Sequence, residues 1–297
     1  MGKPLVRSLF EQSSAAGKLR AAVALPQNNI QVSGLLNDKE EAAYHLNDLE
    51  NILGHRNVLF YPSSYRRPYQ IEETDNANVL LRSEVLNRIS SRQGPALIVT
   101  YPEALFEKVV TKKELQKNTL KLSVGDAVSI DFVNEVLFEH QFTRTDFVTE
   151  PGEFSVRGGI LDVFSYSNDE PYRIEFFGDE VDSIRTFDVA TQLFLQQVKK
   201  MAIVPNIEDK MLNEKRQGLL EFISPKTVIF LKNKELLYGT LNKLFKKATQ
   251  AHEQAQGEVG RAGPEALFMA SAVVQQQLST FVRVSLSDSL NKKPSLK

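Results

Sequence analysis

Apolar residues recur with two different periods along this chain of 297 residues. Between residues 20 and 120, short apolar runs such as 57–62 and 96–100 alternate with segments whose apolar residues recur at helical spacing, chiefly 38–53 and 79–92. Continuous apolar strands between amphipathic helices are typical of a parallel sheet covered by helices. This part of the chain therefore predicts an α/β lobe.

From about residue 119 the apolar period changes to two, apart from one helix at about 130–141. Two glycines, Gly158 and Gly159, separate two alternating runs and favour a type I′ hairpin turn with positive φ at both positions. This segment predicts a small antiparallel α+β domain inserted into the lobe. Its strands are expected at 144–149, 153–157, 160–165, 171–177, 180–187 and 198–203.

The α/β pattern returns with an apolar run at 226–231 and an amphipathic helix at about 233–256. Resumption of the pattern after an insert indicates that the two α/β pieces form one lobe. We therefore expect an α/β domain over 1–118, the antiparallel domain over 119–205, a segment completing the lobe over 206–290 and a polar linker over 291–297.

The composition excludes several classes of function. The chain has no cysteine, which rules out disulfides and thiolate metal centres and favours a cytoplasmic location. No apolar run approaches the roughly 18 residues of a membrane span, so no membrane contact is expected. The four histidines show no paired spacing, and no metal site is predicted.

The net charge of −1 hides an acidic middle. Residues 119–205 contain 7 Lys and Arg against 15 Asp and Glu, a local charge of −8, which leaves +7 for the remainder. Affinity for nucleic acids comes largely from basic patches that neutralise phosphates. The acidic segment therefore favours a protein partner over DNA.

The strand at 30–33 and the helix after it stand where an α/β nucleotide site would lie. A P-loop counted from Gly34 requires glycine, lysine and a hydroxyl residue at positions that hold Lys39, Glu40 and Glu41. Two glutamates would face the triphosphate and its magnesium. This degenerate P-loop predicts that the chain binds no nucleotide cofactor.

The strand at 172–177 carries an unusual outward face. Alternation places Arg173, Glu175 and Phe177 opposite the core residues, and Arg157 ends the neighbouring hairpin strand. Arginine beside an aromatic residue is typical of binding hot spots. The pattern leaves open whether these residues bind a partner or form surface ion pairs. In either case they lie outside the predicted core, and truncation of Arg157, Arg173 or Phe177 to alanine is expected to leave folding nearly unchanged.

Two carboxylates of the same segment, Asp162 and Glu175, could be imagined as a catalytic pair. The strand pattern makes them ordinary sheet residues that neighbours such as Arg185 neutralise. No catalytic residue is predicted.

The motifs PGEFSVRGGILDVF at 151–164 and EPYRIEFFGDEVDSIRTFD at 170–188 closely resemble the N-terminal region of bacterial transcription-repair coupling factors, the Mfd family. The whole chain is similar in arrangement to domains 1a, 2 and 1b of the excision-repair protein UvrB. The resemblance implies a non-catalytic adaptor module that recruits UvrA in transcription-coupled repair at stalled RNA polymerase. It places UvrA contacts on Arg157, Arg173 and Phe177, with Glu175 as a fourth.

The chain also departs from these relatives. UvrB has a working P-loop and a long aromatic clamp for damaged DNA, whereas the stretch 61–78 is too short for that clamp. Helicase motifs of the full-length coupling factors are absent, so contacts with RNA polymerase and DNA are expected only through other parts of such a protein. A monomer is expected. The alternative is a nucleotide- or DNA-binding enzyme domain of the UvrB or helicase type.

Overall fold

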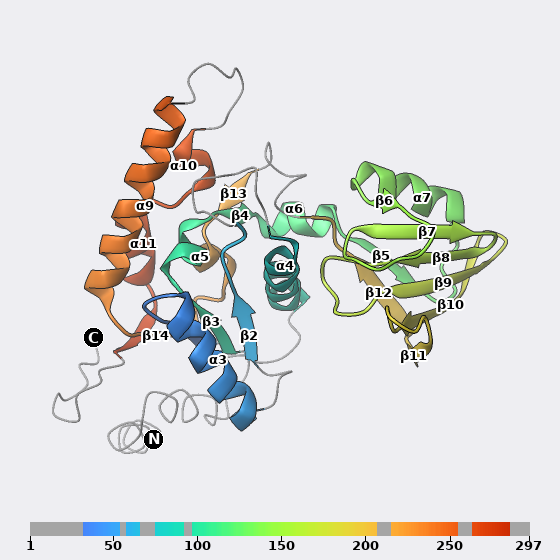
Figure 1. Ribbon diagram of the computed structural model, residues 1–297, viewed down its shortest axis with the longest axis horizontal. Coiled ribbons are helices and arrows are strands. Elements are labelled where there is room, and N and C mark those ends of the chain that lie inside the picture. The colour runs from blue at the N-terminus through green and yellow to red at the C-terminus, as the bar shows by residue number, and fades with distance from the viewer. Residues whose placement is uncertain are drawn as a thin grey trace. The chain divides into compact units, whose positions relative to one another are not determined.

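The computed structural model describes residues 32–53, 58–65, 75–91, 97–206, 215–254 and 263–285. The chain divides into two compact units (Figure 1). Unit 1 combines Met1–Val109 with Arg216–Lys297, and unit 2 consists of Val110–Lys215. The finer division of the chain into segments like UvrB domains 1a, 2 and 1b stays a prediction.

Unit 1 contains a parallel sheet of five strands in the order β15-β14-β1-β3-β2. Its central strand β1 pairs with β14 on one side and with β3 on the other, in parallel. All four residues of β3 are buried, as expected for a continuous apolar strand covered on both faces. The predicted α/β class is confirmed. The strands are β1 (Val32–Leu35), β2 (Val58–Tyr61), β3 (Leu97–Thr100), β14 (Val228–Leu231) and β15 (Val282–Ser285).

The helices of unit 1 pack on this sheet and on one another. Helix α3 contacts β2 and β3, α4 contacts β2, and α9 contacts α5, α10 and α11. In α9 the buried residues Leu237, Leu241, Leu244 and Ala248 recur every three or four positions, which explains why this segment is helical. The helices are α3 (Lys39–Leu53), α4 (Asn76–Ser91), α5 (Pro102–Phe106), α8 (Leu219–Phe222), α9 (Lys234–Gln254), α10 (Pro264–Leu267) and α11 (Ser271–Leu278).

Unit 2 is built on a six-stranded sheet in the order β11-β10-β9-β8-β7-β6. Neighbouring strands from β7 to β11 run antiparallel, and the short β6 pairs in parallel with β7. The antiparallel second part of the fold prediction is therefore also confirmed. The strands are β6 (Thr143–Arg144), β7 (Glu153–Arg157), β8 (Ile160–Val163), β9 (Tyr172–Phe177), β10 (Glu180–Phe187) and β11 (Phe194–Gln197).

Smaller elements complete the described chain. Helix α7 begins after Ser129, whose side chain accepts a hydrogen bond from the Phe132 amide, and it buries Val133 and Leu137. Two two-stranded sheets pair β12 with β5 and β13 with β4. The elements are β4 (Val109–Val110), α6 (Lys112–Lys117), β5 (Leu120–Ser123), α7 (Ile130–Glu139), β12 (Lys200–Ile203) and β13 (Arg216–Gln217).

The two faces of the six-stranded sheet differ. The inner face is apolar, and the ring of Phe138 on α7 meets that of Phe154 edge-on with centroids 5.2 Å apart. The opposite face, called the outer face below, carries the polar residues of β7 to β10. Fully buried inner-face residues are Phe154, Leu161, Val163, Ile174, Val181 and Ile184.

Two details of the predicted strands are wrong. The strand expected at 144–149 ends at Arg144. The chain continues as a loop in which Thr145 Oγ1 donates to the Phe147 backbone oxygen and the Glu153 carboxylate accepts the amides of Thr149 and Glu150. The period of two also gives no sign of β11, whose four residues are all exposed.

The glycine turn between β7 and β8 also differs from the prediction. Only Gly158 has positive φ, at 61°, so the turn is not of type I′. Gly159 is favoured for a different reason: a Cβ there would lie 3.0 Å from the backbone oxygen of Phe176, a tight contact that the neighbouring strand would have to relieve. Its own carbonyl accepts the Phe176 amide at 2.8 Å, which draws the two strands together at this point.

Some sequence predictions concern residues outside the described ranges. They include the start of the first strand at residues 30–31, residues 66–74 of the stretch 61–78 and the linker at 291–297.

Candidate protein-binding surface

The outer face of the six-stranded sheet brings together charged side chains from three neighbouring strands. On β9 the alternate residues Arg173, Glu175 and Phe177 belong to this face. The register places Arg173 opposite Asp162 of β8 on one side and opposite Arg185 of β10 on the other. Strand pairing therefore places one carboxylate and two arginines side by side in a row across the sheet.

Asp162 joins two arginines, which we call the arginine pair (Arg157 and Arg173). Arg173 donates from Nε to Oδ1 of Asp162 at 2.6 Å and from Nη2 to Oδ2 at 2.8 Å. Arg157 donates from Nη2 to the same Oδ2. The hydrogen bonds to Asp162 raise the pKa of the Arg173 guanidinium above its usual value, so this group stays charged at any working pH.

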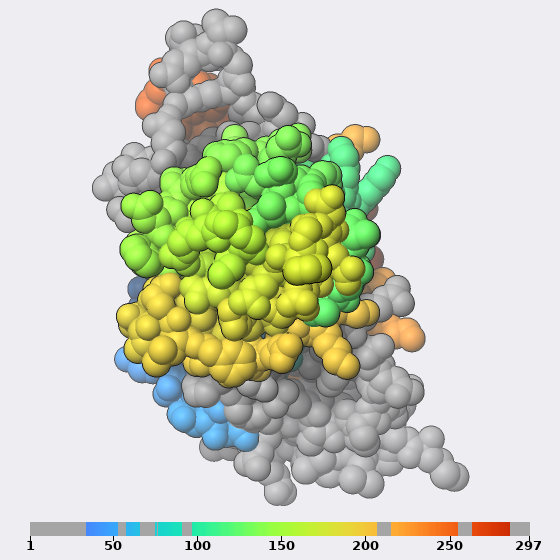
Figure 2. Space-filling model, turned by 90° about the vertical axis from the view of Figure 1, so that its right-hand side faces the viewer, coloured from blue at the N-terminus to red at the C-terminus, as the bar shows by residue number. Residues whose placement is uncertain are grey.

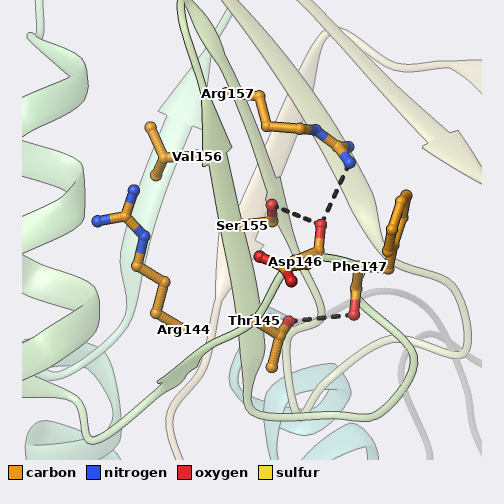
Figure 3. Close-up of a pocket in the computed structure, with 7 residues that line it drawn as sticks. All are labelled: Arg144, Thr145, Asp146, Phe147, Ser155, Val156 and Arg157. Carbon is orange, nitrogen blue, oxygen red and sulfur yellow. Dashed lines mark hydrogen bonds between the residues drawn. The ribbon is translucent and has the colours of Figure 1, made fainter.

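The loop between β6 and β7 lies against the outer face beside the arginine pair. The backbone oxygen of Asp146 accepts hydrogen bonds from Ser155 Oγ at 3.1 Å and from Arg157 Nη1 at 3.2 Å (Figure 3). Further along the loop, Val148 joins Phe164 and Phe187 in a buried apolar cluster. The Asp162 side chain is consequently only 1% exposed, although it belongs to the polar face of the sheet.

A second carboxylate on the outer face has its own partners. Glu175 accepts a hydrogen bond from Ser183 Oγ at 2.7 Å and forms an ion pair with Arg185. Both charged side chains are about one-third exposed. Arg185 thus neutralises Glu175, as the strand pattern predicted for this carboxylate.

Two aromatic side chains of this part of unit 2 are largely exposed. Phe177 is 83% exposed at the end of β9, directly before a turn in which Gly178 has a φ of 59°. Phe147, in the loop after β6, is 62% exposed, and the Arg157 guanidinium lies 5.4 Å from its ring centroid. Figure 2 views the molecule from the right-hand side of Figure 1, and its green and yellow atoms belong to unit 2.

A hollow of about 550 Å³ lies between β6, β7 and the loop that joins them. In Figure 3, Arg157 and Phe147 lie together on one side of β7, and Arg144 and Val156 lie on the other. The residues lining the hollow are Arg144, Thr145, Asp146, Phe147, Ser155, Val156 and Arg157. With two arginines and an exposed ring, the hollow offers cationic and apolar contacts to a partner.

Unit 2 is similar to a known protein family. The family model described as the UvrB interaction domain matches residues 120–208, a range that contains every strand from β5 to β12. Residues 120–208 are thus similar to UvrB interaction domains. The matched segment holds all four residues that the sequence suggested for partner binding, namely Arg157, Arg173, Glu175 and Phe177.

Curated relatives of the chain are transcription-repair-coupling factors. The chain is 31% identical to that of Bacillus subtilis over 202 residues, which are 66% of this chain and 17% of the relative. It is 30% identical to that of Mycobacterium tuberculosis over 203 residues, which are 66% of this chain and 16% of the relative. The similarity thus spans about one-sixth of the relatives' length and reaches beyond the UvrB interaction domain.

The structure brings together only two of the four suggested residues. Arg157 and Arg173 meet on Asp162, whereas Glu175 pairs with Arg185 and Phe177 stands apart at the turn. The central place of Asp162 was missed, although its position in the alternation of β8 put it on the outer face. No sequence signal marked Phe147, because it lies in a loop.

Carboxylates occupy the position of the degenerate P-loop in unit 1. Asp38 accepts the Glu41 amide at the start of α3 at 2.8 Å, and Glu41 accepts the Asn37 amide at 3.0 Å. Glu41 also forms an ion pair with Lys232, which follows β14. The helix N-terminus where a P-loop would bind phosphate thus faces side-chain carboxylates. That the chain binds no nucleotide cofactor stays a prediction.

We also searched the described residues for a metal site and for a membrane-spanning helix. Within them, no three His, Cys, Asp or Glu side chains gather into a group able to hold a metal ion. Nor does the described part of the chain contain a helix with the length and apolar character to cross a membrane.

Proposed function

We propose that the outer face of unit 2 binds UvrA and that the chain is a non-catalytic adaptor in transcription-coupled nucleotide excision repair. The proposal rests on the UvrB interaction domain at 120–208 and on relatives named as transcription-repair-coupling factors. We assign the contacts to Arg157, Arg173, Phe177 and Glu175. We assign no catalytic residue, cofactor, DNA contact or polymerase contact to this chain, and we propose a cytoplasmic monomer.

One observation favours this surface above others on unit 2: an exposed aromatic ring stands at the end of a strand that also carries an ordered arginine. Phe177 buries almost none of its ring in the chain itself, with 83% exposed. A large apolar side chain gains free energy when a partner covers it, and hot spots combine such rings with arginine. Phe177 is therefore proposed as the apolar anchor and the arginine pair as its polar complement.

Titration calorimetry of the purified chain with UvrA tests the proposal. Phe177→Ala is expected to weaken binding by about 1–3 kcal/mol, the range for hot-spot side chains. Phe194→Ala is the matched control, because Phe194 is also an exposed phenylalanine of the same sheet, on the edge strand β11. Parent-like affinity of the Phe177 variant, with the parent chain binding UvrA, would assign the interface to another face.

A further inference from the structure

Asp162 lies at the centre of the outer face but out of a partner's reach. Its side chain is 1% exposed, and both of its carboxylate oxygens accept hydrogen bonds from the arginine pair. A protein that docks on this face would touch the arginines and not the carboxylate beneath them. Any effect of Asp162 on binding must therefore pass through Arg157 and Arg173.

Each arginine is also held by a second contact. The Arg173 guanidinium lies 4.7 Å from the ring centroid of Phe187, which is buried in the cluster with Val148 and Phe164. The Arg157 guanidinium donates to the Asp146 backbone oxygen at 3.2 Å and lies beside the Phe147 ring. Two long side chains that would otherwise sample many rotamers are thus fixed within the chain itself.

We propose that Asp162 is a positioning residue of the binding surface: one buried carboxylate holds both guanidiniums in the arrangement that the partner meets. The proposal rests on the proposed function and deepens it. Ordering flexible side chains upon binding costs free energy, and a surface ordered beforehand avoids that cost. Two guanidiniums also share one carboxylate, which leaves a surplus positive charge at this point of an otherwise acidic unit.

The first test needs no partner. NMR relaxation of the arginine Nε–Hε groups in the full chain reports how ordered each side chain is. Arg173 is expected to be ordered, whereas Arg144, an exposed arginine of β6, serves as the mobile reference. In Asp162→Asn, Arg173 is expected to become as mobile as Arg144. If Arg173 of the parent chain already moves as freely as Arg144, the proposal is wrong, whether or not the variant folds.

The second test is calorimetry with UvrA. Asp162→Asn is expected to weaken binding at least tenfold, about 1.4 kcal/mol. Asp182→Asn is the control for the change in charge, because Asp182 is an exposed acid of β10, and its affinity is expected within twofold of the parent. Parent-like binding by the Asp162 variant, with its circular dichroism unchanged, would overturn the positioning role.

A double-mutant cycle separates positioning from a general loss of structure. In the background of Arg173→Ala, the additional change Asp162→Asn is expected to weaken binding clearly less than it does in the parent chain. An equal loss in both backgrounds would mean that Asp162 does not act through Arg173. If the parent chain itself fails to bind UvrA, the proposed function fails, and the relaxation experiment still decides whether Asp162 orders the arginines.

Discussion

The Arg173 side chain is more buried than its place on the outer face of β9 predicts. Its side chain is 20% exposed and makes two hydrogen bonds to the buried Asp162. Arg173→Ala removes both bonds and leaves a buried carboxylate with fewer donors, which costs about 1–3 kcal/mol of stability. Urea denaturation of the chain measures this loss. The expectation from the sequence, that truncation leaves folding nearly unchanged, is therefore revised for Arg173.

Phe177→Ala is the matched comparison for stability. Because Phe177 is exposed and follows the buried part of β9, its truncation is expected to change the free energy of unfolding by less than about 0.5 kcal/mol. Equal losses in the two variants would show that the Asp162 hydrogen bonds contribute nothing beyond an ordinary surface contact.

Glu103, in the first turn of α5, predicts a dependence of stability on pH. Burial raises its pKa above the ordinary value of 4.5, with Asp38 and Glu40 adding repulsion. The folded chain therefore holds this proton more tightly than the unfolded chain, and stability is lost as the pH rises from about 4.5 through the raised pKa. Glu103→Gln is expected to unfold at a higher temperature than the parent at pH 7.

The advantage of Glu103→Gln is expected to vanish below pH 4, where the carboxyl is protonated in both the folded and the unfolded chain. Melting curves of parent and variant at pH 4 and pH 7 give the comparison. A parent chain that matches the variant at both values would mean that burial of this carboxylate has no cost.

Among the secondary-structure elements, β11 stands out as an exposed sheet edge. It pairs only with β10 in the described sheet, and it exposes the side chains of Leu193, Phe194 and Leu195 in and just before the strand. Unpaired edges with apolar residues tend to pair with other chains. Leu195→Lys is expected to reduce light scattering at high protein concentration and to change stability by less than about 0.5 kcal/mol.

Leu236→Lys provides the matched control for the edge. Leu236 is 43% exposed, close to the 44% of Leu195, but it lies on helix α9. This substitution is expected to leave scattering unchanged, because a helix offers no free hydrogen-bonding edge. The same decrease in both variants would indicate a general effect of charge on solubility.

The period of two predicts β7 to β10 and β12 of unit 2, but it misses β5 and β11 and extends β6 too far. Strands β7 to β10 follow the alternation because one side of each packs in the core. β11 is exposed throughout, so it carries no alternation from which a strand could be predicted. The loop after β6 is fixed by contacts of Asp146 and Glu153, which no local pattern encodes. For the same reason the burial of Asp162 could not be predicted.

At the scale of the whole molecule, the distribution of charge distinguishes the proposed adaptor from the alternative, a DNA- or nucleotide-binding enzyme domain. The segment 119–205 carries a charge of −8, and carboxylates flank the start of α3. Duplex DNA at physiological salt is expected to bind no more tightly than about 10 μM, and ATP with magnesium is expected to give no heat in calorimetry. Submicromolar binding that prefers damaged DNA, or a clear heat with ATP, would favour the enzyme.

The order of strands in the parallel sheet bears on how the chain folds as it leaves the ribosome. Central strand β1 pairs with β14, and the chain builds β14 only after the whole of unit 2. Domains fold during synthesis as their residues become available, and pairings distant in sequence form late. All residues of unit 2 have therefore been synthesised while the central strand β1 of unit 1 still lacks its neighbour β14. The nascent chain can therefore complete the outer face of unit 2 before the parallel sheet of unit 1 forms.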